Sequence, residues 1–241
     1  AIILVHGASA NLRDFTASLL PALSQTHRVL AFDRPGFGHS QRGDADEWCN
    51  PSALADLLLK ATEQLGIDRP VILGHSWAGS VVMSAMVEHE DRIAGGIMLS
   101  AVAGHWAGSV GWTYDVGNLP ILGNLFAHLL VYPAGQFMLE QSIDKVFAPN
   151  RVTDDYIKKI AVPLALRPAT FKHNVEDMMT LSEYMQELST RYDQIDKPLL
   201  VIHGEADTLV PFWNHGRRLI PVIEQLQVAL LPGVGHVPHH S

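Results

Sequence analysis

The feature of this sequence that most restricts its fold is a regular alternation of short apolar runs with longer helical patterns. Several runs are almost continuously apolar, as expected of parallel strands that are covered on both faces. We expect strands at residues 1–5, 28–33, 70–74, 93–100, 198–203 and 226–231. We expect helices near residues 13–24, 51–65, 77–89 and 212–220. This alternation predicts βαβ units, and therefore an α/β fold with a mostly parallel sheet and helices on both faces.

The alternation stops between residues 102 and 190, where the sequence is helix-rich and irregular. A stretch of this length is too long for a loop in a compact domain. We therefore expect an inserted helical cap over the carboxyl ends of the strands, where open α/β sheets bind ligands. The chain would then divide into a first core part (1–101), the cap (102–190) and a second core part (191–241).

The segment Val71–Gly79 joins an expected strand to an expected helix through Ser76. A serine at such a tight turn has a strained backbone, so small residues are needed two positions before it and two after it. Gly74 and Ala78 fill these positions. The segment resembles the G-x-S-x-G nucleophile elbow of the α/β-hydrolase fold superfamily, with Ala78 in place of the second glycine. The resemblance implies an α/β-hydrolase fold in which Ser76 is the nucleophile.

A serine nucleophile needs a base, and the base needs a carboxylate that orients it. The segment Gly204-Glu205-Ala206-Asp207 follows an expected strand and resembles the family's G-x-x-D loop, which implies that Asp207 is the acid. The segment Gly233-Val234-Gly235-His236 follows the last expected strand and resembles the histidine loop, which implies that His236 is the base. Three neighbours compete for these roles from less suitable positions: Glu205, His239 and His240.

Two loops near the start of the chain also resemble the family. His6-Gly7-Ala8 resembles its oxyanion loop, which implies that the backbone N–H groups of Ala8 and Trp77 bind the oxyanion. In this interpretation His6 holds the loop by hydrogen bonds. The segment Asp33–Ser40 resembles the family's D-x-x-G-x-G-x-S turn, which we interpret as loop architecture rather than chemistry.

The expected cap is rich in apolar and aromatic residues. Between Trp106 and Leu139 the only acid is Asp115, and no lysine or arginine occurs. Because burying an unpaired charge is costly, this composition predicts a neutral, apolar substrate. We expect the slot for it to be lined by Trp106, Trp112, Phe126, Phe137 and Met138. The resulting hypothesis is an esterase that needs no cofactor and acts on a small to medium apolar acyl group.

Three alternatives on the same fold stay open. Carbon–carbon bond hydrolases, which cleave vinylogous diketones, also use serine, although their oxyanion loops usually carry more glycine than Ala8-Ser9-Ala10. A non-catalytic ligand-binding protein would keep the fold without the chemistry. Cofactor-free perhydrolases are a smaller rival. Haloalkane dehalogenases and epoxide hydrolases are disfavoured, because they use an aspartate nucleophile where this chain has Ser76.

Charge and composition argue against several other classes. With 17 Lys and Arg against 25 Asp and Glu, the net charge is −8, which argues against a nucleic-acid partner. The H-x-x-H-H run that starts at His236 lacks a carboxylate in its pattern, so we expect no metal site. The apolar stretch Leu119–Leu139 is interrupted by Pro120 and Pro133, which argues against a membrane span.

The remaining expectations concern location and completeness. The single cysteine, Cys49, cannot form an internal disulfide, which favours a reducing, cytoplasmic location. The sequence starts within a strand at Ala1 and stops soon after the histidine loop, so we expect both ends to be trimmed. The place of a signal peptide would then lie outside this sequence. No pattern predicts the oligomeric state.

Overall fold

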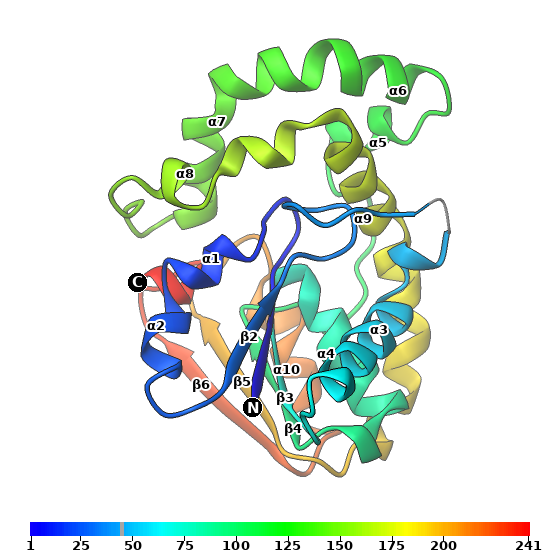
Figure 1. The fold of residues 1–241 in the computed structure, drawn as a ribbon, viewed down its shortest axis with the longest axis vertical. Coiled ribbons are helices and arrows are strands. Elements are labelled where there is room, and N and C mark those ends of the chain that lie inside the picture. Colours follow the sequence, from blue (N-terminus) through cyan, green and yellow to red (C-terminus); the bar gives the residue numbers. More distant parts are fainter. Residues whose placement is uncertain (44–45) are drawn as a thin grey trace.

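The computed structural model describes residues 1–43 and 46–241 and contains a six-stranded sheet (Figure 1). The strands are β1 (Ile2–Val5), β2 (Val29–Phe32), β3 (Val71–His75), β4 (Gly95–Leu99), β5 (Leu199–Gly204) and β6 (Leu226–Leu231). Their order across the sheet is β2-β1-β3-β4-β5-β6, and every neighbouring pair is parallel. The predicted parallel sheet is confirmed, with each strand in its expected place.

The expected core helices are present as α1 (Arg13–Thr16), α2 (Leu19–Leu23), α3 (Pro51–Gln64), α4 (Gly79–Glu88) and α10 (Gly216–Leu219). Asn50 is the N-cap of α3. Its side chain accepts a 2.8 Å hydrogen bond from the Ser52 amide, and Pro51 takes the first helical position. The helix expected at 13–24 is broken instead. Ser18 leaves the helical region, with φ −134° and ψ −94°, so α1 and α2 are separate helices.

Apolar residues of β1 alternate between the two faces of the sheet. Ile3 and Val5 belong to the hydrophobic cluster under α3 and α4, whereas Ile2 and Leu4 belong to the cluster that includes Phe15 of α1. This is the two-residue period of a strand. The helices therefore cover both faces of the sheet, as predicted.

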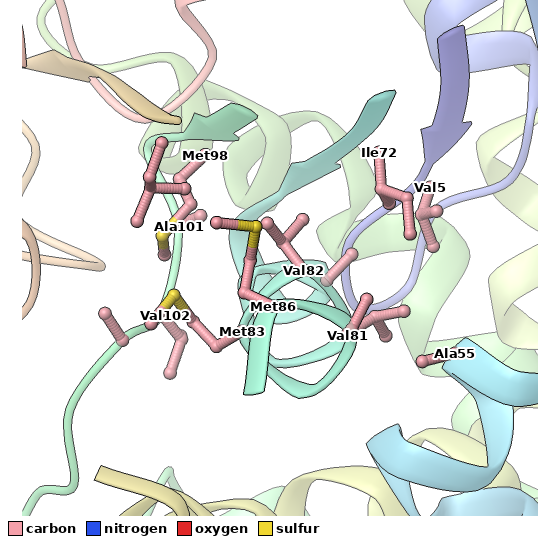
Figure 2. Close-up of a cluster of buried hydrophobic side chains, with 14 of the residues drawn as sticks. Val5, Ala55, Ile72, Val81, Val82, Met83, Met86, Met98, Ala101 and Val102 are labelled. Carbon is pink, nitrogen blue, oxygen red and sulfur yellow. The ribbon is translucent and has the colours of Figure 1, made fainter. Parts of the chain in front are cut away.

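Helix α4 lies deep in the larger cluster. Figure 2 shows the side chains of Val81, Val82, Met83 and Met86 on this helix, among residues of β1, β3, β4 and α3. Its first residue is Gly79, and a Cβ there would lie 2.4 Å from the carbonyl oxygen of Val102. Burial of this helix fixes its N-terminus at Gly79, three residues after Ser76.

The segment between β4 and β5 forms a helical insertion above the carboxyl ends of the strands (Figure 1). It contains α5 (Trp112–Gly117), α6 (Leu122–Phe126), the π-helical turn η4 (Ala127–Val131), α7 (Tyr132–Phe147), α8 (Tyr156–Lys159) and α9 (Pro168–Leu188). The second half of α9 leaves the insertion, and its residues Leu181, Met185 and Leu188 join the core cluster. The division at residues 101 and 190 stays a prediction.

A search of the described residues for membrane-spanning helices found none with the required length and apolar character.

Candidate active site

Ser76 lies at a sharp turn between β3 and α4. Its φ is +54°, an unfavourable conformation for a residue with a side chain. The single turn Ser76–Ala78 (η2) connects the strand to the helix. A Cβ on Gly74 would lie 2.3 Å from the carbonyl oxygen of Ala78, so glycine is required there. The alanine two positions after Ser76 is accommodated, and it is fully buried.

The structure brings Ser76, His236 and Asp207 together from the ends of three strands. His236 Nε2 lies 2.9 Å from Ser76 Oγ, and His236 Nδ1 lies 2.8 Å from Asp207 Oδ2. The other carboxylate oxygen of Asp207 accepts 2.9 Å hydrogen bonds from the amides of Leu209 and Val210. These two amides fix the plane of the carboxylate, and the carboxylate fixes the imidazole ring.

The three competing residues lie elsewhere. Glu205 is exposed, whereas Asp207 is buried. His239 and His240 donate from Nε2 to the two oxygens of Asp14, at 2.9 and 2.8 Å. Within the described residues, neither of these histidines forms a hydrogen bond with Ser76.

Asp14 supplies a carboxylate that the histidine run lacks in sequence. One ligand atom from each of Asp14, His75 and His239 lies within 4.8 Å of the others, so these side chains could hold a metal ion. Tyr156 also donates to Asp14, at 3.1 Å, so three donors already occupy this carboxylate. We interpret the cluster as a hydrogen-bonded support that attaches the histidine loop to α1. His75 adds to it by pairing its Nε2 with the carbonyl oxygen of His236, at 2.9 Å.

The loop after β1 packs directly against the turn at Ser76. A Cβ on Gly7 would lie 2.9 Å from Ser76 Cβ, so the loop can approach this closely only as glycine. Ala8 and Trp77, the two residues expected to bind an oxyanion, line the same cavity as Ser76. The Trp77 amide belongs to the first turn of a helix, where N–H groups lack an intrahelical acceptor.

A residue of the insertion also holds this loop, and the sequence did not indicate it. Asn174 on α9 accepts a hydrogen bond from the Ser9 amide and donates one to Ser9 Oγ, both at 2.9 Å. The same side chain donates to the hydroxyl of Tyr114 at 3.0 Å. Ser9 has φ +53°, so these contacts stabilise a strained residue next to Ala8.

The structural role expected for His6 and the Asp33 turn is confirmed. His6 Nδ1 pairs with the Gly7 carbonyl at 2.9 Å, and its Nε2 accepts from the Arg34 amide at 3.0 Å. Asp33 accepts from the amides of Leu12 and His39, at 2.8 and 2.9 Å. These side chains connect loops, and none of these hydrogen bonds reaches Ser76.

A buried ion pair beneath Trp77 is a second feature that the motifs did not indicate. Arg34 donates to Asp177 at 2.7 Å, and its guanidinium stacks 3.9 Å from the centroid of the Trp77 ring. Arg42 donates to the same carboxylate at 2.9 Å, and Trp77 Nε1 donates to the Asp177 carbonyl at 3.1 Å. Burial lowers the pKa of Arg34 to about 10, which leaves it charged at neutral pH. Both arginines are therefore paired with Asp177, and the ring of Trp77 is held by the Arg34 guanidinium and the Asp177 carbonyl.

A cavity of about 1030 Å³ lies between the sheet and the insertion, with Ser76 and His236 in its wall. Four of the five predicted slot residues line it: Trp106, Trp112, Phe126 and Met138. The prediction for Phe137 is wrong, because this side chain is 92% exposed and lies outside the cavity. Phe137 is on the opposite side of α7, so its aromatic character faces solvent rather than substrate.

A model of the alpha/beta hydrolase fold family matches residues 1–241. The chain belongs to this family. Among curated relatives, it is 24% identical to a 2-hydroxy-6-oxo-6-phenylhexa-2,4-dienoate hydrolase of Burkholderia cepacia, over 98% of this chain and 81% of that one. It is 25% identical to a bifunctional esterase/perhydrolase of Acinetobacter calcoaceticus, over 96% of this chain and 83% of that one.

Solved structures of this family have the same fold. An alpha/beta hydrolase fold protein from Burkholderia ambifaria is 24% identical, with a TM-score of 0.80 over 99% of this chain and 84% of that one. A thermophilic esterase from Thermogutta terrifontis is 23% identical, with a TM-score of 0.77 over the same shares of the two chains. The predicted family and fold are therefore confirmed, and the relatives include more than one chemistry.

Buried histidines should make this family member sensitive to acid. Burial lowers the pKa of His6 to about 3 and that of His215 to about 4. In the unfolded chain both titrate near the ordinary value of about 6.5, so between these limits only the unfolded state binds the protons. Stability must then fall as the pH is lowered. We expect each histidine to reduce the free energy of unfolding by about 2 kcal/mol between pH 7 and pH 5, measured by urea denaturation.

His215→Gln is the matched variant for this measurement. His215 Nδ1 accepts from the amides of Ala103 and Gly104, at 3.3 and 3.1 Å, and a glutamine carbonyl can replace that acceptor without titrating. We expect this variant to lose about 2 kcal/mol of the pH dependence. His27→Gln, at an exposed site, should keep all of it. An unfolding free energy that is equal at pH 7 and pH 5 in the native chain would contradict the assignment.

Proposed function

We propose that this chain is a serine hydrolase that cleaves carboxylic esters with a small to medium apolar acyl group. One observation carries the proposal: Ser76 Oγ is 2.9 Å from an imidazole that is itself 2.8 Å from a buried carboxylate, at the wall of an apolar cavity. A hydroxyl is a weak nucleophile unless a positioned base removes its proton. The assignment of Ser76, His236 and Asp207 as nucleophile, base and acid is part of this proposal.

The proposed reaction has two steps. Ser76 Oγ attacks the carbonyl carbon of the ester while its proton passes to His236 Nε2. The oxyanion that forms accepts hydrogen bonds from the amides of Ala8 and Trp77. The bond to the alcohol oxygen then breaks, His236 returns the proton to that oxygen, and the acyl group stays on Ser76. Water attacks this acyl-enzyme with the same base, which releases the acid and restores Ser76.

The wall of the cavity supports a neutral substrate. Among the described residues that line it, none is lysine or arginine. Asp14 is the one residue there with a carboxylate, and His75, His215 and His236 also line the cavity. Arg34 and Arg42 are paired with Asp177. An anionic substrate would therefore enter without a counter-ion, which is costly in an apolar site.

The same observation separates the ester proposal from its main rival. The substrate in the name of the Burkholderia cepacia relative is a dienoate, which carries a carboxylate group. This cavity offers that group no lysine or arginine among its described lining residues. The name of the Acinetobacter calcoaceticus relative includes esterase activity, which agrees with the proposal.

The proposal can be tested with a panel of aryl esters of increasing acyl length beside a vinylogous diketone. We expect turnover of short to medium acyl esters and negligible cleavage of the diketone. A fluorophosphonate probe should label Ser76 covalently, since phosphonylation needs the same activated hydroxyl. Cleavage of the diketone with negligible ester turnover would favour the carbon–carbon hydrolase. Absence of labelling in a folded sample would favour a non-catalytic binding protein.

A further inference from the structure

Exposed apolar side chains are concentrated on the insertion. Among the residues that the structure describes, eighteen large hydrophobic residues have exposed side chains, and ten of them lie from Trp112 to Met138. A monomeric protein rarely exposes a contiguous apolar surface of this kind without a partner for it. Most of these residues belong to α6, η4 and α7, which form one continuous helical run at the top of Figure 1.

The side chains of this helical run fall into rows with a spacing of four residues. The least exposed row packs towards the protein: Gly123, Ala127, Val131, Gly135 and Leu139. One turn of an α-helix takes about 3.6 residues, slightly fewer than four, so a row of residues spaced by four would gradually rotate around the helix axis. The wider π-helical turn η4 offsets part of this rotation and keeps each row on one side.

Two other rows are apolar, and they differ in what they face. One lines the cavity that contains Ser76: Phe126, Leu130, Ala134 and Met138. The next, which we call the outer row, faces solvent: Ile121, Leu125, Leu129, Pro133 and Phe137. Phe137 is 92% exposed and Ile121 is 83% exposed. The outer row extends over about 24 Å of helix at 1.5 Å per residue.

The remaining exposed row is polar but carries no acidic or strongly basic side chain. It consists of Asn124, His128, Tyr132 and Gln136, and no Asp, Glu, Lys or Arg occurs anywhere between Val116 and Leu139. A helix that binds anionic lipid usually carries lysine or arginine on its polar face. This one does not, and the net charge of −8 would oppose an anionic surface. The charge pattern therefore fits an electrically neutral surface.

We propose that the outer row docks the insertion on a neutral, zwitterionic lipid surface, with the mouth of the cavity facing that surface. The row that lines the cavity connects the cavity to the lipid surface, because its residues Leu130 and Met138 line the cavity and are also 54% and 53% exposed. A molecule dissolved in the lipid can pass along Leu130 and Met138 towards Ser76. A second copy of the chain on the same face would instead cover the mouth. Docking itself does not depend on the proposed ester chemistry.

The test is flotation of the purified chain with phosphatidylcholine vesicles. The native chain should float with the vesicles, equally at low and high salt, and should bind no better when phosphatidylglycerol is added. Phe137→Glu should lower the ratio of bound to free protein about tenfold or more, since it removes a large apolar contact and adds a charge. Ser76→Ala should bind like the native chain, so this result is independent of the esterase test.

The matched control is Gln136→Glu, which adds the same charge on the neighbouring polar row. It should keep at least half of the native vesicle binding. Both variants should melt like the native chain and hydrolyse a water-soluble short ester at the native rate, since neither residue lines the cavity. Three results would overturn the proposal: no flotation of the native chain, an equal loss in both variants, or a stable dimer in solution that Phe137→Glu dissociates.

Discussion

Ser76→Ala should lower kcat for a water-soluble aryl ester by about a million-fold, which is the loss found when the serine of a comparable triad is removed. The alanine lacks the oxygen that attacks the carbonyl, and Ser76 Oγ is the atom within 2.9 Å of His236 Nε2. The backbone strain at φ +54° is similar for both side chains, so the melting temperature should change little. The measurement is steady-state turnover together with a thermal melt.

Ser40→Ala is the control for this variant. Ser40 also follows a glycine–histidine pair, Gly38-His39, but it is exposed in the turn after β2. It should keep the native rate. If Ser40→Ala were inactive and Ser76→Ala active, the nucleophile would have been assigned to the wrong serine.

The arrangement of the candidate triad was predictable because each of its residues follows a strand of one parallel sheet. Ser76 follows β3, Asp207 follows β5 and His236 comes after β6, and the carboxyl ends of parallel strands meet at one edge. Local glycine patterns mark each of these turns. The resemblance of these three loops to the family's motifs, together with their order along the chain and their positions at strand ends, was therefore enough to predict that the three side chains meet.

The supporting contacts were not predictable in the same way. Asn174 and Asp177 lie on a helix of the insertion, 135 to 165 positions from the residues they bind, Ser9, Arg34 and Arg42. Asp14 meets its histidines across more than 220 positions. No local pattern marks such pairs, because they depend on how the insertion and the end of the chain pack on the core.

Phe137 shows a different reason for failure. Its aromatic side chain and apolar neighbours indicated a substrate slot, but composition does not say which side of a helix faces the cavity. Met138, the next residue, faces the cavity while Phe137 faces solvent. Two adjacent apolar rows on one helix look alike in sequence, and only the packing of Gly123 and Ala127 against the protein distinguishes them.

Asp207→Asn should lower kcat at neutral pH by about four orders of magnitude, the size of effect known for this change in a serine protease triad. The geometry indicates why a nearly isosteric change is so costly. The amides of Leu209 and Val210 both donate to Oδ1, at 2.9 Å, so the asparagine must place its carbonyl oxygen there. Its NH₂ group then faces His236 Nδ1, which must become an acceptor.

The proton of His236 is thereby moved to Nε2, where it faces Ser76 Oγ, and the ring can no longer remove the serine proton. The loss should therefore appear in kcat, measured on the same aryl ester, with little change in KM or in the melting temperature. Glu205→Gln is the matched control, because Glu205 is exposed and only two positions away, and it should keep the native rate. An unchanged rate in Asp207→Asn with an inactive Glu205→Gln would transfer the role of the acid to Glu205.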